Sequence, residues 1–155
     1  MKRTIAILLA LLMVLSLAAC GGGNKDKDKL IGRWANHTPF YSTYNPGTDT
    51  YISFESDEYY SFFKNNEFYY QYEGGVDLWT GSRVPRDEWT RYVLHGTYSM
   101  KDGIIVLKYD DPEREDEKIP YHINEYTKEL MLDVNENGES KWHKYSDEPQ
   151  ILTLD

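Results

Sequence analysis

Cysteine is nearly absent from this chain of 155 residues, in which Cys20 is the only one. A single cysteine cannot form an internal disulfide, so a fold built on a disulfide framework is excluded. Positive charge is also scarce, because 17 Lys and Arg stand against 26 Asp and Glu, a net charge of −9. This acidic balance argues against nucleic acid, or an anionic bilayer surface, as a partner.

The sequence patterns of common catalytic and cofactor sites are missing as well. There is no Gly-x-Ser-x-Gly segment and no glycine-rich phosphate loop ahead of a helix. Carboxylates are abundant, which leaves a glycosidase-type pair open without indicating a particular one. The histidines show no spacing typical of metal ligands; they are His37, His95, His122 and His143. We therefore expect neither an enzyme nor a bound cofactor or metal.

The first 19 residues differ from the rest of the chain. Lys2 and Arg3 precede an unbroken apolar run at 5–15, and small residues follow it. The run is shorter than the roughly 20 apolar residues that a transmembrane helix needs, so we predict a secretory signal peptide at 1–19. Its removal takes away two of the 17 basic residues and leaves 15 against 26 acidic ones, a net charge of −11.

The signal peptide ends at Leu17-Ala18-Ala19-Cys20, which resembles the lipobox of bacterial lipoproteins. The resemblance implies that the chain is cut before Cys20 and that a lipid is attached to its sulfur. It also implies that the protein is anchored to the extracytoplasmic side of the cell membrane. A cysteine suits this role because its thiolate is a strong nucleophile. A cleaved signal peptide followed by an unmodified thiol is the alternative.

Residues 20–29 contain three consecutive glycines and then the charged segment NKDKDK at 24–29, with no apolar side chain. A segment without apolar surface to bury is not expected to become ordered, and glycine adds flexibility. We therefore predict that 20–29 is a flexible tether between the lipid and a domain at 30–155.

From Leu30 onward the apolar residues alternate with polar ones, and turn residues recur at short intervals. The segment GTYSMKDGIIVLKY predicts a hairpin with Asp102-Gly103 as a two-residue turn of type I′. This turn places Tyr98 opposite Leu107 and Met100 opposite Ile105, with all four on one face. One apolar face and one mixed face are typical of a half-buried antiparallel pair.

The segment KNNEFYYQY predicts a second hairpin, with Asn65-Asn66 as its turn and Phe63 opposite Phe68. We expect another turn at 56–58. In this register one face carries Ile52, Phe54, Tyr60, Phe62 and Tyr69. The other face carries Tyr51, Tyr59, Phe63, Phe68, Tyr70 and Tyr72. A sheet with aromatic residues on both faces is either covered on both sides or exposes one of them for binding.

A third hairpin joins the strand predicted at 129–134 to the one at 140–145. Residues 73–87 contain several glycines and are predicted to form an irregular loop or a short edge strand. The acidic segment 110–118 is predicted to be a solvated loop. With roughly eight to ten strands joined mostly by hairpins and no long helix, the fold class is all-β, either an antiparallel up-and-down barrel or a sandwich.

The segment Leu30-Ile31-Gly32-Arg33-Trp34 resembles the Gly-x-Trp opening of lipocalins. The hairpin segment at 96–107 is similar to one found in small lipocalin-like domains of bacterial lipoproteins. The resemblance implies a lipocalin-like up-and-down barrel over 30–155 that binds a ligand. It also implies that Trp34 closes the bottom of the barrel beneath a basic side chain, which Lys141 or Lys144 would supply where the family usually has arginine.

The segment 133–144 comes close to an EF-hand calcium loop. Its matching positions are Asp133, Asn135, Asn137 and Gly138. However, Lys144 stands at the twelfth position, where a bidentate glutamate belongs. A hairpin loop with a left-handed glycine explains the same residues and pairs Leu132 with Trp142, so we expect a hairpin here.

Aromatic residues are the most informative feature of the domain, with 14 Tyr, 5 Phe and 4 Trp. Such side chains bind flat apolar ligands or sugars, and they anchor protein interfaces. The segment next to Trp79 and Trp89 could cover the mouth of a barrel. The candidate binding residues are Tyr60, Phe62, Phe63, Phe68, Tyr70, Trp79, Trp89 and Tyr98.

Two functions stay open at this point. In the first, the barrel binds a small apolar ligand or an envelope component, which requires an interior cavity of several hundred Å³. Its expected lining is Tyr60, Phe62, Tyr98 and Leu107. In the second, the domain is a non-enzymatic interaction or structural module that docks through an aromatic outer face. A filled interior, with Phe63, Phe68 and Tyr70 exposed together, would favour the second.

Overall fold

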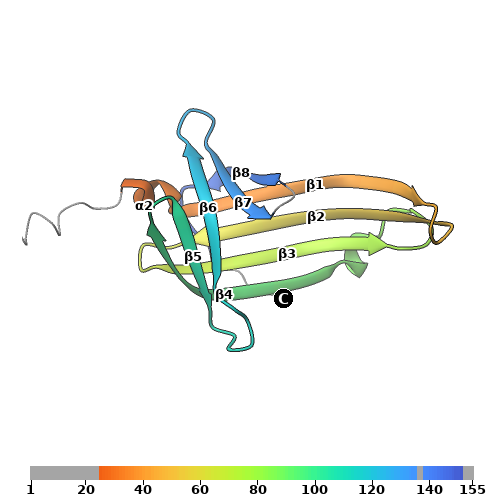
Figure 1. Ribbon diagram of the computed structural model, residues 1–155, viewed down its shortest axis with the longest axis horizontal. Helices are drawn as coiled ribbons and strands as arrows, with labels where there is room; N and C mark the ends of the chain where they lie inside the picture. The colour runs from red at the N-terminus through yellow and green to blue at the C-terminus, as the bar shows by residue number, and fades with distance from the viewer. Residues whose placement is uncertain (1–24, 136–137, 152–155) are drawn as a thin grey trace, which may run out of the picture.

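The structure of the protein is a computed structural model that describes residues 25–135 and 138–151. Within these ranges eight antiparallel strands pair in chain order, and the last pairs with the first, so the sheet closes into an up-and-down barrel (Figure 1). A short helix precedes the barrel and a 3-10 turn lies in its longest connection. The elements are α2 (Lys25–Leu30), β1 (Gly32–Asn45), β2 (Thr50–Phe62), β3 (Glu67–Asp77), η1 (Arg86–Glu88), β4 (Thr90–Lys101), β5 (Ile104–Tyr109), β6 (Glu117–Asn124), β7 (Glu129–Asn135) and β8 (Gly138–Ser146). The predicted all-β, lipocalin-like barrel is confirmed.

The two halves of the barrel differ in length. Strands β1 to β4 have 11 to 14 residues each, whereas β5 to β8 have 6 to 9. A strand rises about 3.3 Å per residue, so the four long strands extend well past the short ones on the side away from α2 (Figure 1). The barrel therefore has a closed end beside α2 and an open end, where the sheet of long strands stands alone.

The hydrophobic core fills the closed end. Each strand contributes inward-facing side chains to it, and α2 contributes one more. The Trp34 indole N–H donates to the carbonyl oxygen of Leu30 at 2.7 Å, which ties the helix to the barrel floor. The core residues are Leu30, Trp34, Tyr60, Phe62, Phe68, Tyr98, Ile105, Leu107, Ile119, Leu130, Leu132 and Trp142.

Helix α2 lies in a segment that we expected to be part of a flexible tether, and for 25–29 this expectation is wrong. Leu30, at the end of the helix, is fully buried beneath the barrel. Lys29 forms an ion pair with Glu125 in the β6–β7 connection. Residues 25–29 carry no apolar side chain. The helix is therefore ordered by its buried neighbour Leu30 and by the ion pair of Lys29 with Glu125, which lies 96 residues further along the chain.

The hairpin between β4 and β5 has the predicted register. Asp102 and Gly103 have φ angles of 52° and 76°, as a type I′ turn requires at both central positions. Tyr98 lies opposite Leu107, and the strand pairing continues to Lys101 opposite Ile104. The predicted hairpin is confirmed. The prediction succeeds because the turn type fixes the register of both strands.

The loop between β2 and β3 is one residue longer than predicted. The Phe63 N–H donates to the carbonyl oxygen of Glu67 at 2.9 Å, so the loop consists of three residues, 64–66. Asn66, the last of them, has a φ of 71°. A three-residue loop that ends on a left-handed residue is a common hairpin connection, and asparagine tolerates that conformation better than most residues.

This extra loop residue changes which side chains of β3 face the interior. Phe62 lies opposite Phe68 and Tyr60 opposite Tyr70, so the predicted pairing of Phe63 with Phe68 is wrong. A shift of one residue turns every side chain of a strand to the other face. The β3 aromatic residues that we placed on the outer face therefore point into the barrel; they are Phe68, Tyr70 and Tyr72.

Strand β2 also differs from the prediction, because it runs without a break through 56–58, where we expected a turn. Ser56 pairs with Thr38 on one side and with Gly74 on the other. A residue inside a sheet has its backbone groups bonded to both neighbouring strands, so nothing favours a turn there. The turn that begins β2 lies earlier, between Asn45 and Thr50.

The β7–β8 hairpin is present, but its register is shifted by two residues. Trp142 lies opposite Leu130, not opposite Leu132 as predicted. A shift of two residues leaves all three side chains on the inner face. The described part of the chain does not include residues 136–137 or the side chains of 133–139. The four residues that match the calcium pattern are among these, so that pattern lies outside the described residues.

The segment 73–87, predicted to form an irregular loop or a short edge strand, is a strand in its first part, because β3 continues to Asp77. The remainder belongs to the β3–β4 connection, 78–89, which folds back across the outer face of β2 and β3. There the buried Ser53 hydroxyl donates to the carbonyl oxygen of Ser82. The connection therefore covers part of the outer face of β2 and β3, whereas nothing in the described ranges covers the inner face above the short strands.

Candidate functional site

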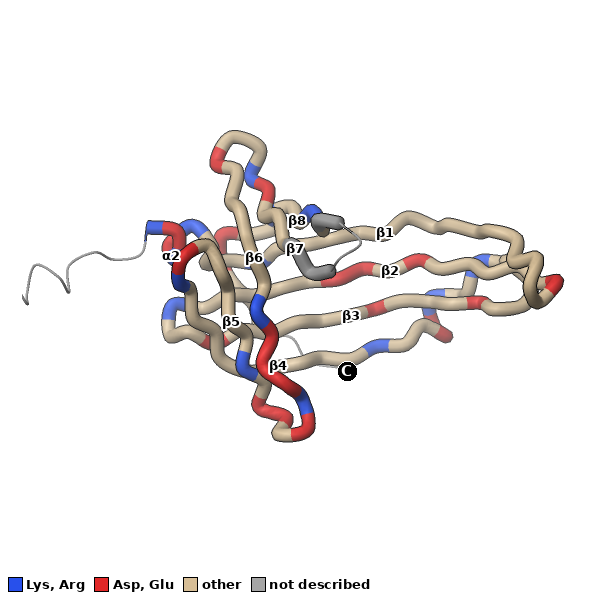
Figure 2. The backbone as a smooth tube through the Cα atoms, viewed as in Figure 1, with Lys and Arg blue, Asp and Glu red and all other residues tan. Residues whose placement is uncertain are grey.

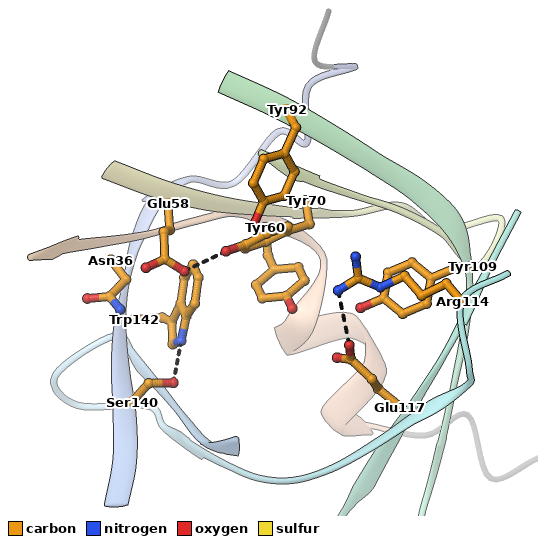
Figure 3. Close-up of a pocket in the computed structure, with 10 residues that line it drawn as sticks. All are labelled: Asn36, Glu58, Tyr60, Tyr70, Tyr92, Tyr109, Arg114, Glu117, Ser140 and Trp142. Atoms are coloured by element: carbon orange, nitrogen blue, oxygen red, sulfur yellow. Dashed lines mark hydrogen bonds and ion pairs between the residues drawn. The ribbon is translucent and has the colours of Figure 1, made fainter. Parts of the chain in front are cut away.

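A cavity of about 290 Å³ lies in the barrel above the core, toward the open end. Strands β1 to β6 and β8 contribute side chains to its wall, as does the β5–β6 connection. Figure 3 shows aromatic rings and polar groups converging on it. The lining residues are Asn36, Glu58, Tyr60, Tyr70, Tyr92, Tyr109, Arg114, Glu117, Ser140 and Trp142.

Aromatic rings form a continuous part of this wall. The Tyr60 ring lies 4.8 Å from the Tyr70 ring and 4.9 Å from the Trp142 ring, measured between centroids. Tyr92 continues the row at 6.1 Å from Tyr70 and stacks on Tyr72 at 5.1 Å. Tilted and offset contacts of this kind are the favoured geometries of aromatic pairs, so the rings hold one another in place.

Polar groups are set between the rings. The Tyr70 hydroxyl donates to the Glu58 carboxylate at 2.7 Å. The Trp142 indole N–H donates to the Ser140 hydroxyl at 2.9 Å, and this hydroxyl donates to a backbone carbonyl of β7. These bonds fix the side chains before any ligand arrives, which lowers the entropic cost of binding.

The β5–β6 connection closes one side of the cavity. It is strongly acidic and exposed, as predicted, and Figure 2 shows its Asp and Glu residues in a nearly continuous run. Arg114 is the one basic residue of this connection, and its guanidinium carbon lies 4.3 Å from the centroid of the Tyr109 ring. Arg114 also forms an ion pair with Glu117 at 3.3 Å.

Three tyrosine hydroxyls of the cavity, those of Tyr60, Tyr70 and Tyr109, have a raised pKa and stay in the neutral form. Burial raises the pKa of Tyr70, and the hydrogen bond to Glu58 raises it further, because a second negative charge beside the carboxylate is unfavourable. Burial also raises the pKa of Tyr60 and of Tyr109, with Glu117 adding to the effect on Tyr109. The tyrosines therefore serve as hydrogen-bond donors and as ring surfaces, not as bases.

The wall of the cavity continues beyond it as the inner face of the long sheet. Tyr41 lies opposite Phe54, and Phe54 lies opposite Val76. These side chains share the inner face with Glu58 and Tyr60, because alternate residues of a strand point to the same side. Tyr41 is 52% exposed and Val76 is 55% exposed. We call this surface, with Tyr92, the uncovered wall.

The predicted lining is correct only in part. Tyr60 lines the cavity, and so does Tyr70, which we had placed on the outer face. The predicted outer surface of Phe63, Phe68 and Tyr70 is not formed, because Phe63 alone faces outward, beside Tyr69. The other expected lining residues fill the closed end instead, together with Phe68; they are Phe62, Tyr98 and Leu107.

The two tryptophans of the β3–β4 connection do not cover the mouth, so that expectation is wrong. Trp89 is buried on the outer face of β3, where its indole N–H donates to the carbonyl oxygen of Val84 at 3.1 Å. Its ring packs so closely on Gly75 that a side chain there would overlap it. Trp79 is 74% exposed on the same connection. Glycine at position 75 is what lets the connection lie on the sheet.

Trp34 and Lys144 meet at the closed end. They are paired residues of β1 and β8, and the Lys144 amino nitrogen lies 5.5 Å from the centroid of the Trp34 ring. Lys144 also forms an ion pair with Asp147 at 2.8 Å. Lys141, the other candidate, points away and pairs with Glu129 at 3.6 Å. Lys144 thus occupies the place that the lipocalin resemblance assigns to a basic residue.

Several cavity residues were not predicted as site residues. Glu58 was predicted to lie in a turn, and Tyr92 was not among the candidate binding residues. Arg114 and Glu117 were treated as part of a solvated loop. Among residues 25–135 and 138–151, no group of three His, Cys, Asp or Glu side chains is arranged to hold a metal ion. Cys20 lies outside the described residues.

Comparison with known proteins adds no family to this description. No family model matches the chain, and a search of the curated proteins found no match. None of the helices in the described ranges has the length and apolar character needed to cross a membrane.

Proposed function

We propose that this protein is an extracytoplasmic, membrane-anchored lipoprotein whose barrel binds a small ligand in the cavity at its open end. One observation carries the proposal: an apolar core fills the interior at one end and leaves a cavity of about 290 Å³ at the other. An aromatic wall with a few fixed polar groups is typical of small-molecule sites. The proposed activity is binding without catalysis.

The ligand would enter along the uncovered wall. Phe54 is 39% exposed and its ring lies 5.4 Å from that of Tyr41, so the route into the cavity is apolar and aromatic. Glu58 and Asn36 stand where this route reaches the cavity. A ligand with an apolar or flat body and at least one polar group matches both parts of the surface.

The anchor rests on the lipobox resemblance of residues 17–20. Five residues lead from Cys20 to the start of α2 and span at most about 18 Å when fully extended. Helix α2 lies at the closed end (Figure 1). A diacylglyceryl group on Cys20 would therefore hold the closed end near the bilayer, and the cavity would face away from it.

A protein partner that docks on the uncovered wall is a second candidate. It is favoured by the exposure of large apolar side chains there, which are Tyr41, Phe54, Val76 and Tyr92. Exposed apolar patches of this kind mark interaction sites. Replacing Tyr41 and Phe54 by serine would abolish partner capture while a ligand in the cavity is still retained, and this separates the two candidates.

Native mass spectrometry tests the ligand proposal. The full chain is purified from its own host in a maltoside detergent and released from the micelle in the instrument. We expect a second mass, beyond that of the lipidated chain, which is lost when the protein is unfolded first. Spectra that contain only the chain and detergent would contradict the proposal.

Cell fractionation tests the anchor. Because the thiolate is the group that accepts the lipid, Cys20→Ser should release the protein from the membrane fraction or leave its signal peptide uncut. A variant that stays in the membrane with unchanged migration would count against lipidation. This result would leave the cavity proposal intact, since the two rest on different residues.

A further inference from the structure

Two sides of the cavity carry the same kinds of side chain, but only one of them holds a cation. On one side the Arg114 guanidinium lies over the Tyr109 ring and pairs with the Glu117 carboxylate. Figure 3 shows this group on one flank and Glu58 on the other, with Tyr60 between them. The first flank is therefore complete: a carboxylate, an aromatic face and a positive charge.

The second flank has the carboxylate and the rings without the charge. Glu58 accepts a hydrogen bond from Tyr70, whose ring packs on Tyr60. The Tyr60 ring packs in turn on Trp142, and all four side chains line the same cavity. In the ranges that the structure describes, no lysine, arginine or histidine forms an ion pair with Glu58. Among the lining residues that the structure describes, the one cation is Arg114, and it is already paired with Glu117.

We infer that the ligand carries a compact positive charge, such as an ammonium group, which binds between Glu58 and the rings of Tyr70 and Trp142. This inference rests on the proposed function, because it names the chemical class of ligand for the same cavity. The aromatic face is the negative end of the ring quadrupole, so it attracts a cation and adds to the attraction of the carboxylate.

The charges of the lining favour this class over the others. Glu58 and Glu117 are opposed only by Arg114, so the lining carries one uncompensated negative charge. A monovalent cation would neutralise it, whereas an anionic ligand would face two carboxylates and find the one guanidinium occupied. A neutral ligand would leave Glu58 without a counter-charge in a partly desolvated site, which is unfavourable.

A pair of small probes of equal shape tests the inference. Choline carries a trimethylammonium group, and 3,3-dimethylbutan-1-ol has the same shape without the charge. Binding of each to the full chain in maltoside is measured by isothermal titration calorimetry. We expect choline to bind at least about tenfold more tightly, because the Glu58 carboxylate and the faces of the rings attract only the charged probe.

Two near-isosteric variants locate the effect. Glu58→Gln should reduce the preference for choline by at least about fivefold, because it removes the carboxylate charge and keeps its shape, while the rings of Tyr70 and Trp142 still attract the cation. Glu55→Gln is the matched control: Glu55 lies on the same strand but on the outer face, where it pairs with Arg83 at 3.0 Å. This control should leave the preference unchanged.

The outcomes separate the inference from the proposal beneath it. Equal binding of the two probes, no binding of choline at millimolar concentration, or an unchanged preference in Glu58→Gln would overturn the cationic ligand. A retained neutral or anionic compound in the native mass spectrum would overturn it too, while supporting the cavity as a binding site. A retained amine, with the preference reduced only in Glu58→Gln, would support both.

Discussion

Both ends of the barrel interior contain aromatic residues. The two ends differ in the hydrogen-bond partners and in the exposure of these side chains. At the closed end, the Tyr98 hydroxyl donates to the carbonyl oxygen of Phe63, and the ring is buried among apolar neighbours. At the open end, the Tyr70 hydroxyl donates to a carboxylate, and Tyr92 stays 38% exposed. Aromatic content alone therefore does not set the role of a strand. The lengths of β5 to β8 decide this role, because these short strands cover only part of the sheet formed by β1 to β4.

The largest expected effect lies at the closed end. Phe62 is 1% exposed and packs on Tyr98, with centroids 5.1 Å apart. Phe62→Ala should lower the free energy of unfolding by about 3–5 kcal/mol, since it removes a large buried ring and leaves a cavity. Tyr92→Ala at the open end should cost about 1 kcal/mol or less. Urea denaturation measures both, and equal losses would contradict the division into a packed and an open end.

High pH should weaken the closed end next. Burial raises the pKa of Tyr98 from 10.0 to about 12, so the folded state holds this proton more tightly than the unfolded chain does. The stabilisation is complete below pH 10 and is lost as the pH rises toward 12. The free energy of unfolding should therefore fall over this interval, and less steeply in Tyr98→Phe. Denaturation curves at several pH values test this, and identical slopes would show that Tyr98 does not contribute.

The two faces of the long sheet should differ by a smaller amount. A side chain at Gly75 would meet Val84 and Trp89 of the β3–β4 connection. Gly75→Ala should cost about 1–3 kcal/mol through overpacking and should expose the connection to proteases. Val76→Ala, one residue on and facing the uncovered wall, should change stability by less than about 0.5 kcal/mol. Thermal unfolding compares the two variants, and a larger loss for Val76→Ala would reverse the assignment of covered and uncovered faces.

The smallest effect concerns the contact that closes the floor. Lys144→Ala removes a partly buried amino group from the Trp34 ring and from Asp147, so about 1–2 kcal/mol should be lost. Lys141→Ala removes only an exposed ion pair with Glu129 and should cost less than about 0.5 kcal/mol. Parallel urea titrations of the two variants give the difference. Indistinguishable unfolding midpoints would show that the contacts of Lys144 do not stabilise the closed end.

The sequence predicts the barrel class but not the lining of its cavity, and two turns show why. Asp102-Gly103 fits one turn type with both residues left-handed, so its register follows from local chemistry. Asn65-Asn66 fits a two-residue or a three-residue loop equally well, and the choice between them decides which face of β3 is inside. The cavity residue Tyr70 depends on that choice.

Other parts of the site depend on long-range packing, which alternation does not encode. Arg114 lies in an acidic loop with the pattern of a solvated segment, and only the closed barrel brings it to the Tyr109 ring. Glu58 interrupts an aromatic strand and was predicted to lie in a turn. A charged residue on the inner face of a strand breaks the usual pattern, and such a break is itself a signal of a functional site.

The most direct test compares retained ligand in two tryptophan variants on strand β1. Asn36 lines the cavity, and Asn36→Trp would fill it; His37 is exposed on the outer face, and His37→Trp serves as the control. Native mass spectrometry of each full chain from its own host gives the amount of ligand retained. We predict that the wild type and His37→Trp carry the extra mass and that Asn36→Trp does not. Equal retention by the two variants would contradict a binding site in the open end of the barrel.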